Sequence, residues 1–121
     1  EIEASHSDGE RFRFELVAEP LFLELNRAIP CGLVINELVS NAMKHNRDRT
    51  DPVEIVVAIR KEAGSVVVEI SNTGVPLPED FDLRGQKGLG LTLVDSLAAQ
   101  LGGTINVVRD GRTTFTLTFP F

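Results

Sequence analysis

The sequence predicts an α+β domain in which helices cover one face of a mixed, mostly antiparallel sheet. Short runs rich in β-branched residues have the pattern of strands, and two longer segments have the amphipathic period of helices. Their order is strand, helix, two strands, loop, helix and two strands. Because a length of 121 residues suits one domain, we expect residues 1–121 to form a single two-layer α/β sandwich.

Five segments have strand patterns, and two pairs of them are joined by turn sequences. The connection 61–64 predicts an antiparallel hairpin, and the Asp110–Gly111 pair predicts a second hairpin near the end of the chain. The expected strands are residues 11–17, 53–60, 65–71, 104–109 and 113–121.

Two segments are predicted to be helices, residues 30–46 and residues 89–101. Pro30 suits the first position of a helix, where no backbone N–H bond is needed, and residues 21–28 are expected to form a separate short helical turn. Gly102 and Gly103 are a strong signal for the end of the second helix. In the first helix the predicted apolar arc is Gly32, Ile35, Leu38, Val39, Ala42 and Met43, and the predicted polar arc is Glu37, Asn41, Lys44 and His45.

Charge and composition argue against several classes of partner. The net charge of −6 and the pI of about 4.8 disfavour a general affinity for nucleic acid. Lys and Arg form no run, so contact with a membrane surface is not expected. The first residues lack the pattern of a signal peptide, so a cytoplasmic location is expected. Since the chain begins in a polar phrase without Met, we expect it to be part of a longer protein.

Cysteine and histidine are too rare to define a site by themselves. The single Cys31 excludes an internal disulfide, and its place in an apolar helix pattern predicts a packed thiol. His6, in a polar segment, is expected to be exposed to solvent.

The polar arc of the first helix offers groups suited to a nucleotide and its metal. Glu37 and Asn41 are four residues apart, so their side chains lie on one face. The amide oxygen of Asn41 is a suitable ligand for Mg²⁺, a carboxylate orients or deprotonates a nucleophile, and Lys44 supplies positive charge to a phosphate. The alternative is that these residues form an ordinary solvated helix face.

A long glycine-containing segment, residues 72–88, precedes the second helix. Its basic residues Arg84 and Lys87 lead into 88-GLGL-91, where glycines allow the backbone to approach phosphate oxygens at a helix N-terminus. Loops of this length within a compact domain are usually functional or disordered. A GxG sequence alone is a weak signal, and these glycines are also consistent with a loop that simply has to turn.

Taken together, three motifs resemble those of a known superfamily. The stretch 36-NELVSNAMKH-45 resembles the N box of the GHKL ATPases, 72-NTG-74 lies where that superfamily has its G1 box, and 88-GLGL-91 resembles its G2 box. Their order and spacing resemble the catalytic ATP-binding domain of bacterial sensor histidine kinases, from about Arg11 to Phe119. The sequence around the motifs is most similar to the HisKA_2 and HWE subgroup, which has short ATP lids.

The resemblance implies a Bergerat fold and the activity of a histidine kinase. Such a domain binds Mg²⁺ and ATP and passes the γ-phosphoryl group to a histidine on a separate dimerisation domain, which here would lie upstream in the same protein; a response regulator is then an indirect partner. Two alternatives remain open. One is a degenerate ATP-binding domain with a regulatory or docking role, and the other is a different GHKL ATPase, such as an anti-sigma-factor serine kinase or a DNA-repair ATPase.

The resemblance also implies roles for individual residues. Glu37 would orient or activate the attacking group, and Asn41 would bind Mg²⁺. The other implied nucleotide contacts are Asn36 and Lys44 at the phosphates, His45 at the nucleoside, Asn72 and Gly74 in the G1 box, Arg84 and Lys87 on the lid, Gly88, Leu89 and Gly90 in the phosphate-facing turn, and Thr114 near the adenine.

The G1 box departs from the family pattern at two positions. The family has an Asp that accepts a hydrogen bond from the adenine amino group, where this chain has Asn72, and Pro76 replaces the second glycine of the box. An amide oxygen still accepts this bond, but loss of charge assistance costs about 1 kcal/mol. A second alignment pairs Ser71 with the Asp but needs an extra residue before Gly74. We therefore predict that ATP is bound, with reduced affinity.

Overall fold

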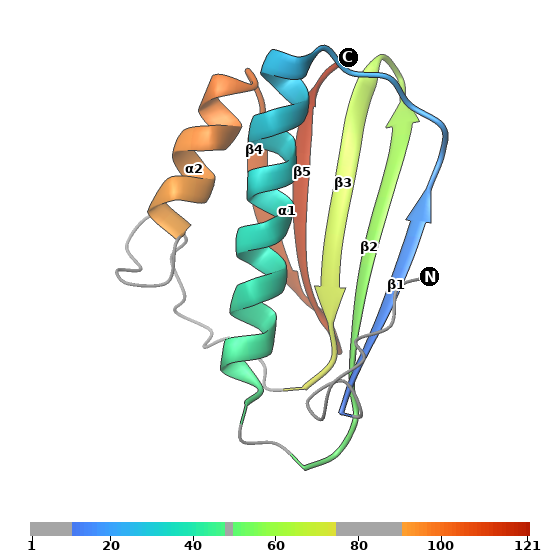
Figure 1. Cartoon of the computed structure of the whole chain (residues 1–121), viewed down its shortest axis with the longest axis vertical. Coiled ribbons are helices and arrows are strands. Elements are labelled where there is room, and N and C mark those ends of the chain that lie inside the picture. Colours follow the sequence, from blue (N-terminus) through green and yellow to red (C-terminus); the bar gives the residue numbers. More distant parts are fainter. Residues whose placement is uncertain (1–10, 48–49, 75–90) are drawn as a thin grey trace.

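The computed structural model describes residues 11–47, 50–74 and 91–121 of the chain. Its elements follow the predicted order (Figure 1). They are β1 (Phe12–Ala18), α1 (Leu25–His45), β2 (Val53–Glu62), β3 (Ser65–Asn72), α2 (Leu91–Gln100), β4 (Thr104–Arg109) and β5 (Thr113–Pro120).

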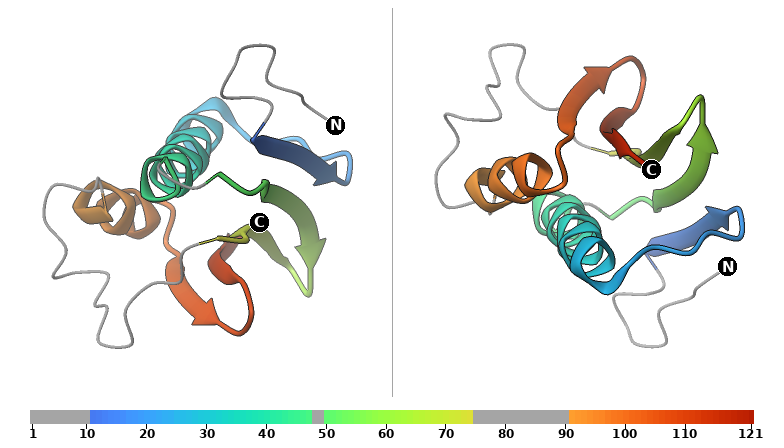
Figure 2. Two further views of the ribbon diagram at one scale, coloured as in Figure 1. Left: turned by 90° about the horizontal axis from the view of Figure 1, so that it is seen from below. Right: turned by 90° about the horizontal axis from the view of Figure 1, so that it is seen from above.

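The five strands form one mixed sheet in the order β1-β2-β3-β5-β4. β1 is parallel to β2, and the three other neighbouring pairs are antiparallel. Both helices lie on the same face of the sheet, as the two views along its strands show (Figure 2). The predicted two-layer α/β sandwich with helices on one face is therefore confirmed.

The core lies between the helices and the central strands. Side chains of β5 alternate strictly, so that Phe115, Leu117 and Phe119 are buried under the helices while the threonines between them face the other side. From α1, the buried residues Val34 and Leu38 pack against the same cluster. This packing fixes the height of α1 over the sheet, and with it the position of every polar group near its C-terminal end.

The start of α1 differs from the prediction. The helix begins at Leu25, so residues 25–28 are its first turn and Pro30 lies inside it. The backbone N–H groups of Arg27 and Ala28 bond to the carbonyl of Glu24 at 2.9 and 2.8 Å, and the Arg27 guanidinium lies 5.2 Å from the centre of the Phe119 ring. Pro30 removes one helical hydrogen bond. The tertiary contacts of the first turn, together with burial of Pro30 itself, offset this loss.

The apolar face of α1 is also rotated from the predicted arc. Gly32 is exposed, whereas Val34 and Asn41 are buried, so the line in contact with the core runs through Cys31, Val34, Leu38 and Ala42. The prediction of a packed Cys31 thiol is confirmed, and burial raises the pKa of this thiol. Among the helices that the structure describes, none combines the length and apolar character needed to cross a membrane.

Two turns follow the rules expected from their residues. Ala63 and Gly64 join β2 to β3 with φ of 53° and 80°, as in a tight hairpin turn. After α2, Gly102 has φ of 71°, and the N–H groups of Gly102 and Gly103 bond to the carbonyls of Ala99 and Ala98 at 3.0 and 2.9 Å. These two hydrogen bonds form a Schellman motif, which turns the chain directly into β4.

Replacing Gly103 by alanine is expected to lower the free energy of unfolding by about 1–3 kcal/mol. A Cβ at this position would lie 2.2 Å from the backbone oxygen of Thr118. The matched control is Gly32→Ala, whose Cβ would meet no atom within 4 Å and which should stabilise the helix by about 0.5–1 kcal/mol. Urea denaturation followed by circular dichroism measures both changes. Equal stability of the two variants would contradict the close approach of Gly103 to β5.

Candidate functional site at the ends of α1 and β3

Buried polar side chains gather at one end of the fold. The structure describes four such residues, and all lie where the C-terminal end of α1 meets the end of β3 and the start of β5. They are Asn41, Asn46, Asn72 and Thr113. Polar groups are costly to bury, so a concentration of them at one place marks a candidate binding site.

Asn72 is the last residue of β3 and is directly paired with Thr113 of β5. Its Nδ2 atom donates a hydrogen bond of 2.7 Å to the carbonyl of Thr73. Because a carbonyl oxygen only accepts hydrogen bonds, this contact fixes which end of the amide is which. The Oδ1 atom of Asn72 is therefore the end left to accept a hydrogen bond from a ligand.

Thr73 fastens the start of the following segment to β2. Its hydroxyl accepts a hydrogen bond of 2.9 Å from the N–H of Glu54, and its own N–H donates to the Glu54 carbonyl at 3.0 Å. These two bonds extend the β2–β3 ladder by one residue, so the position of Gly74 follows from the sheet.

Asn46 joins the end of α1 to Gly74. Its side chain is fully buried, and its Nδ2 donates a bond of 2.7 Å to the carbonyl of Ala42, one of the last-turn carbonyls that the helix itself leaves open. A Cβ on Gly74 would lie only 2.1 Å from the Oδ1 atom of Asn46, and the φ angle of Gly74 is 107°. A glycine is required there for both reasons. The sequence analysis missed Asn46, because neither helical periodicity nor the three motifs single out this residue.

Three residues of the predicted polar arc differ in exposure. Asn41 is buried, Glu37 one turn earlier is half-buried, and Lys44 is exposed in the last turn. The side chain of Asn41 has interactions within the protein, and no described residue donates a hydrogen bond to its Oδ1 atom. Lys44 lines a small cavity with Arg11 and Arg47 on the other flank of the helix, from where its flexible side chain reaches solvent.

A cavity of about 260 Å³ lies beside Asn72 and Thr113. Gly74 and Gly111 line it with backbone atoms, and Arg109 and Arg112 add two guanidinium groups that the sequence analysis did not identify. The Nη1 atom of Arg112 is 3.2 Å from the Glu54 carboxylate. The structure pairs Arg109 with Thr113 across β4 and β5, and the predicted turn at Asp110–Gly111 was the signal in the sequence that could have located these arginines.

Thr114 and Asn36 do not join this group. Thr114 faces the opposite side of the sheet from Asn72, because side chains alternate along β5, and the hydroxyl beside Asn72 belongs to Thr113 instead. Asn36 is exposed and lines a separate cavity between α1 and the strands β1 and β2. The structure thus places Thr113, not Thr114, beside Asn72, and places Asn36 at a different cavity.

The remaining predicted residues have the following positions. His45 is exposed at the end of α1 and does not line the cavity beside Asn72. The lid and glycine residues lie outside the described part of the chain: Pro76, Arg84, Lys87, Gly88, Leu89 and Gly90.

Comparison with known proteins places these features in a family. Residues 26–121 match the family described as histidine kinase-, DNA gyrase B-, and HSP90-like ATPase. The sensor protein CzcS of Cupriavidus metallidurans is 35% identical over 104 residues, which cover 71% of this chain and 21% of that protein. The sensor histidine kinase PdtaS of Mycobacterium tuberculosis is 35% identical over 103 residues, which cover 83% of this chain and 20% of PdtaS.

Solved structures share the fold. The blue-light activated histidine kinase EL346 of Erythrobacter litoralis superimposes with a TM-score of 0.83 at 24% identity, covering 91% of this chain and 35% of that one. The catalytic domain of the histidine kinase ThkA gives a TM-score of 0.73 at 24% identity, covering 91% and 78%. This chain thus spans about a fifth of the curated sensor proteins that it matches. It belongs to the histidine kinase-, DNA gyrase B-, and HSP90-like ATPase family, as a catalytic ATP-binding domain of the sensor histidine kinase type.

Proposed function

We propose that this chain binds Mg²⁺ and ATP at the ends of α1 and β3 and passes the γ-phosphoryl group to a histidine on a separate dimerisation domain. The observation that carries the proposal is the gathering of Asn41, Asn46, Asn72 and Thr113 at one end of an ATPase-family fold. In phosphoryl transfer a protein mainly positions groups and neutralises charge, so a few well-held polar residues suffice.

The adenine is proposed to lie against Asn72 and Thr113. The Oδ1 atom of Asn72 accepts a hydrogen bond from the adenine amino group, since its Nδ2 atom is held by Thr73. The Thr113 hydroxyl lies beside it on the same face of the sheet and adds a second polar contact. Gly74 lines the same cavity as these two side chains.

The phosphates are proposed to lie along α1, toward Asn41 and Lys44. The described residues contain no group of three or more His, Cys, Asp or Glu side chains suited to a metal. The amide oxygen of Asn41 fits Mg²⁺, which is usually held by few protein oxygens together with phosphates and water. When bound, the cation neutralises phosphate charge. Glu37 is placed one turn away to orient the attacking group.

Further contacts of this site remain proposals from the sequence. Arg84 and Lys87 are proposed to neutralise the terminal phosphates, with Gly88, Leu89 and Gly90 forming the turn that faces them, and His45 is proposed to approach the nucleoside. Assignment to the subgroup with short lids is likewise a prediction.

The rest of the reaction is proposed to occur outside this chain. CzcS and PdtaS are about five times as long as the region they share with it, which is consistent with further domains. We propose that the dimerisation domain with the acceptor histidine lies upstream in the same cytoplasmic protein, and that a response regulator receives the phosphoryl group next.

Asn72 favours a second candidate function, a nucleotide-binding domain with a regulatory role and weak catalysis. Where the family has a carboxylate, this chain has an amide, which forms a weaker hydrogen bond with the adenine amine.

Calorimetric titration with Mg²⁺ and a non-hydrolysable ATP analogue tests the main proposal first. We expect saturable binding, and no binding at millimolar nucleotide would contradict the proposed kinase function of this chain.

Asn41→Ala is expected to weaken binding of the Mg²⁺–ATP analogue by about tenfold or more, since a bond to a charged group contributes about 1.5–3 kcal/mol. Asn36→Ala is the matched control on the same helix, and its effect should be less than about twofold because Asn36 lines a different cavity. Calorimetry gives both affinities, and circular dichroism checks that each variant is folded. Similar losses in both variants would contradict the placement of the phosphates.

Asn72→Asp is expected to tighten ATP binding several-fold, because a carboxylate adds about 1 kcal/mol of charge assistance to the bond with the adenine amine. The same change should lower the stability of the free protein, because the bond from Nδ2 to the Thr73 carbonyl is lost and two oxygens face each other. Calorimetry and urea denaturation separate the two effects. Unchanged or weaker ATP affinity would show that Asn72 does not read the adenine.

Asn46→Ala is expected to cost about 1–3 kcal/mol of stability, because the Ala42 carbonyl loses its partner in a buried place. It should also weaken ATP binding, because Gly74 loses the side chain that packs against it. Asn106→Ala, an exposed asparagine of β4, is the control and should change neither quantity. Wild-type ATP affinity in the Asn46 variant would mean that this contact supports only the fold.

A further inference from the structure

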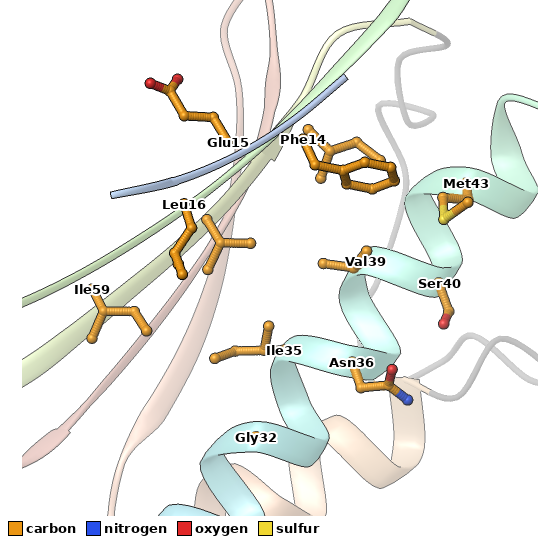
Figure 3. A pocket seen from close by; sticks show the side chains of 12 residues that line it. Phe14, Glu15, Leu16, Gly32, Ile35, Asn36, Val39, Ser40, Met43 and Ile59 are labelled. Carbon is orange, nitrogen blue, oxygen red and sulfur yellow. The ribbon is translucent and has the colours of Figure 1, made fainter. Parts of the chain in front are cut away.

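An apolar cavity of about 630 Å³ lies between α1 and the strands β1 and β2 (Figure 3). β1 lies on the opposite side of α1 from α2 (Figure 2). Ile35, Val39 and Met43 approach it from the helix, and Phe14 and Leu16 approach it from β1 (Figure 3). Its volume lies within the range of about 300–1,000 Å³ that is usual for small-molecule sites. None of the residues proposed to contact the nucleotide lines this cavity.

The cavity is open because the helix has no side chain to fill it at Gly32. A Cβ at Gly32 would meet no atom within 4 Å, although this glycine lies in a helix interior, where alanine is more stable. Glu15 borders the cavity but its carboxylate points away from it, beyond β1 (Figure 3). Leu16 remains 40% exposed at the mouth. Protein interiors are normally close-packed, so an apolar space of this size on a helix flank marks a place for another apolar group.

A basic cavity of about 240 Å³ continues from the apolar one toward the end of α1. The two share Ser40 and Met43 in their walls, and three cations line the second: Arg11, Lys44 and Arg47. Arg11 is held in place by a bond of 3.3 Å from its Nη1 to the Asn46 carbonyl, while the side chains of Lys44 and Arg47 are exposed. Three cations gathered in a chain of net charge −6 form a local site for an anion.

We propose that this continuous surface binds an anionic amphiphile, specifically a free long-chain carboxylate. The hydrocarbon chain lies along α1 between Gly32 and Met43, and the carboxylate lies at the basic end near Arg47. Gly32 and Met43 are about 16 Å apart along the helix axis at 1.5 Å per residue, so an extended hydrocarbon chain is accommodated better than a compact ring. Charge complementarity at one end and apolar walls along the rest together select this class of ligand.

The ligand would lie on the reverse side of the helix that carries Glu37 and Asn41. Lys44 lines only the basic end of this surface, and the apolar cavity itself is lined by none of the proposed nucleotide contacts.

The test uses dansylaminoundecanoate as a fluorescent probe with the whole chain. We expect a saturable enhancement of probe fluorescence, which dodecanoate reverses. Dodecanol should need an at least about tenfold higher concentration to displace the probe, since it lacks the charge that the basic end binds.

Gly32→Leu fills the cavity and should abolish probe binding without lowering the melting temperature, while the matched control Gly32→Ala should still bind the probe. Arg47→Glu should weaken dodecanoate at least about fivefold and leave dodecanol unchanged.

A second variant locates the probe independently. The chain has no Trp and no Tyr, so Leu16→Trp introduces a single indole at the half-exposed mouth of the cavity. Energy transfer from this indole to the bound dansyl group is expected, and dodecanoate should remove it.

Several results would overturn the proposal. They are the absence of saturable binding, binding that Gly32→Leu leaves intact, equal displacement by dodecanoate and dodecanol, or no energy transfer from the introduced indole. Binding only to vesicles of anionic phospholipid, and not to the soluble acid, would assign the surface to a membrane instead. A saturating ATP analogue should not displace the probe, so the result does not depend on the nucleotide site.

Discussion

The contact between Asn46 and Gly74 holds the candidate site together. Asn46 is the first residue after α1, and Gly74 is the second residue after β3. The side-chain amide of Asn46 donates a hydrogen bond to the carbonyl of Ala42, and its oxygen packs against the Gly74 backbone. Core packing already holds α1 on the sheet, and Asn46 adds a buried polar contact between the end of this helix and the residues that follow β3.

The same helix serves two surfaces with different physical character. One flank presents Glu37 and Asn41 beside the core, at the end of the sheet where the polar groups are buried. The other flank presents Gly32, Ile35 and Val39 to an incompletely filled apolar space. A helix packed on a sheet has a side on either flank of its buried face. The sequence of α1 therefore supplies apolar residues to the core, polar residues to the candidate site on one flank, and the wall of the apolar cavity on the other.

Much of the fold follows from local sequence patterns. The β-branched runs, the Asp110–Gly111 turn and the Gly102–Gly103 pair predicted strands and a helix end within a few residues of their observed positions. The predicted start of α1 was wrong. The preference of proline for the first position of a helix was outweighed by the contact of Arg27 with Phe119 and by burial of Pro30 inside the helix. Such contacts come from residues far apart in the chain, and no local pattern contains them.

The structure separates neighbouring or similar residues that the sequence pattern alone does not distinguish. Two adjacent threonines differ only in which face of β5 they occupy, and the strand register places Thr113, not Thr114, beside Asn72. Asn36 and Asn46 are equally polar in the sequence, yet the helix places the first at the apolar cavity and the second in a fully buried contact. Arg109 and Arg112 reach the cavity through the β4–β5 turn, which no motif includes.

The most direct measurement is a nuclear magnetic resonance titration of the isotope-labelled chain with Mg²⁺ and a non-hydrolysable ATP analogue. If the nucleotide spans the ends of α1 and β3, the side-chain amide signals of Asn41, Asn46 and Asn72 should shift. Those of Asn26, Asn36 and Asn106, which lie away from this end, should stay unchanged. Shifts centred on Asn36, or no shifts at saturating nucleotide, would contradict the account.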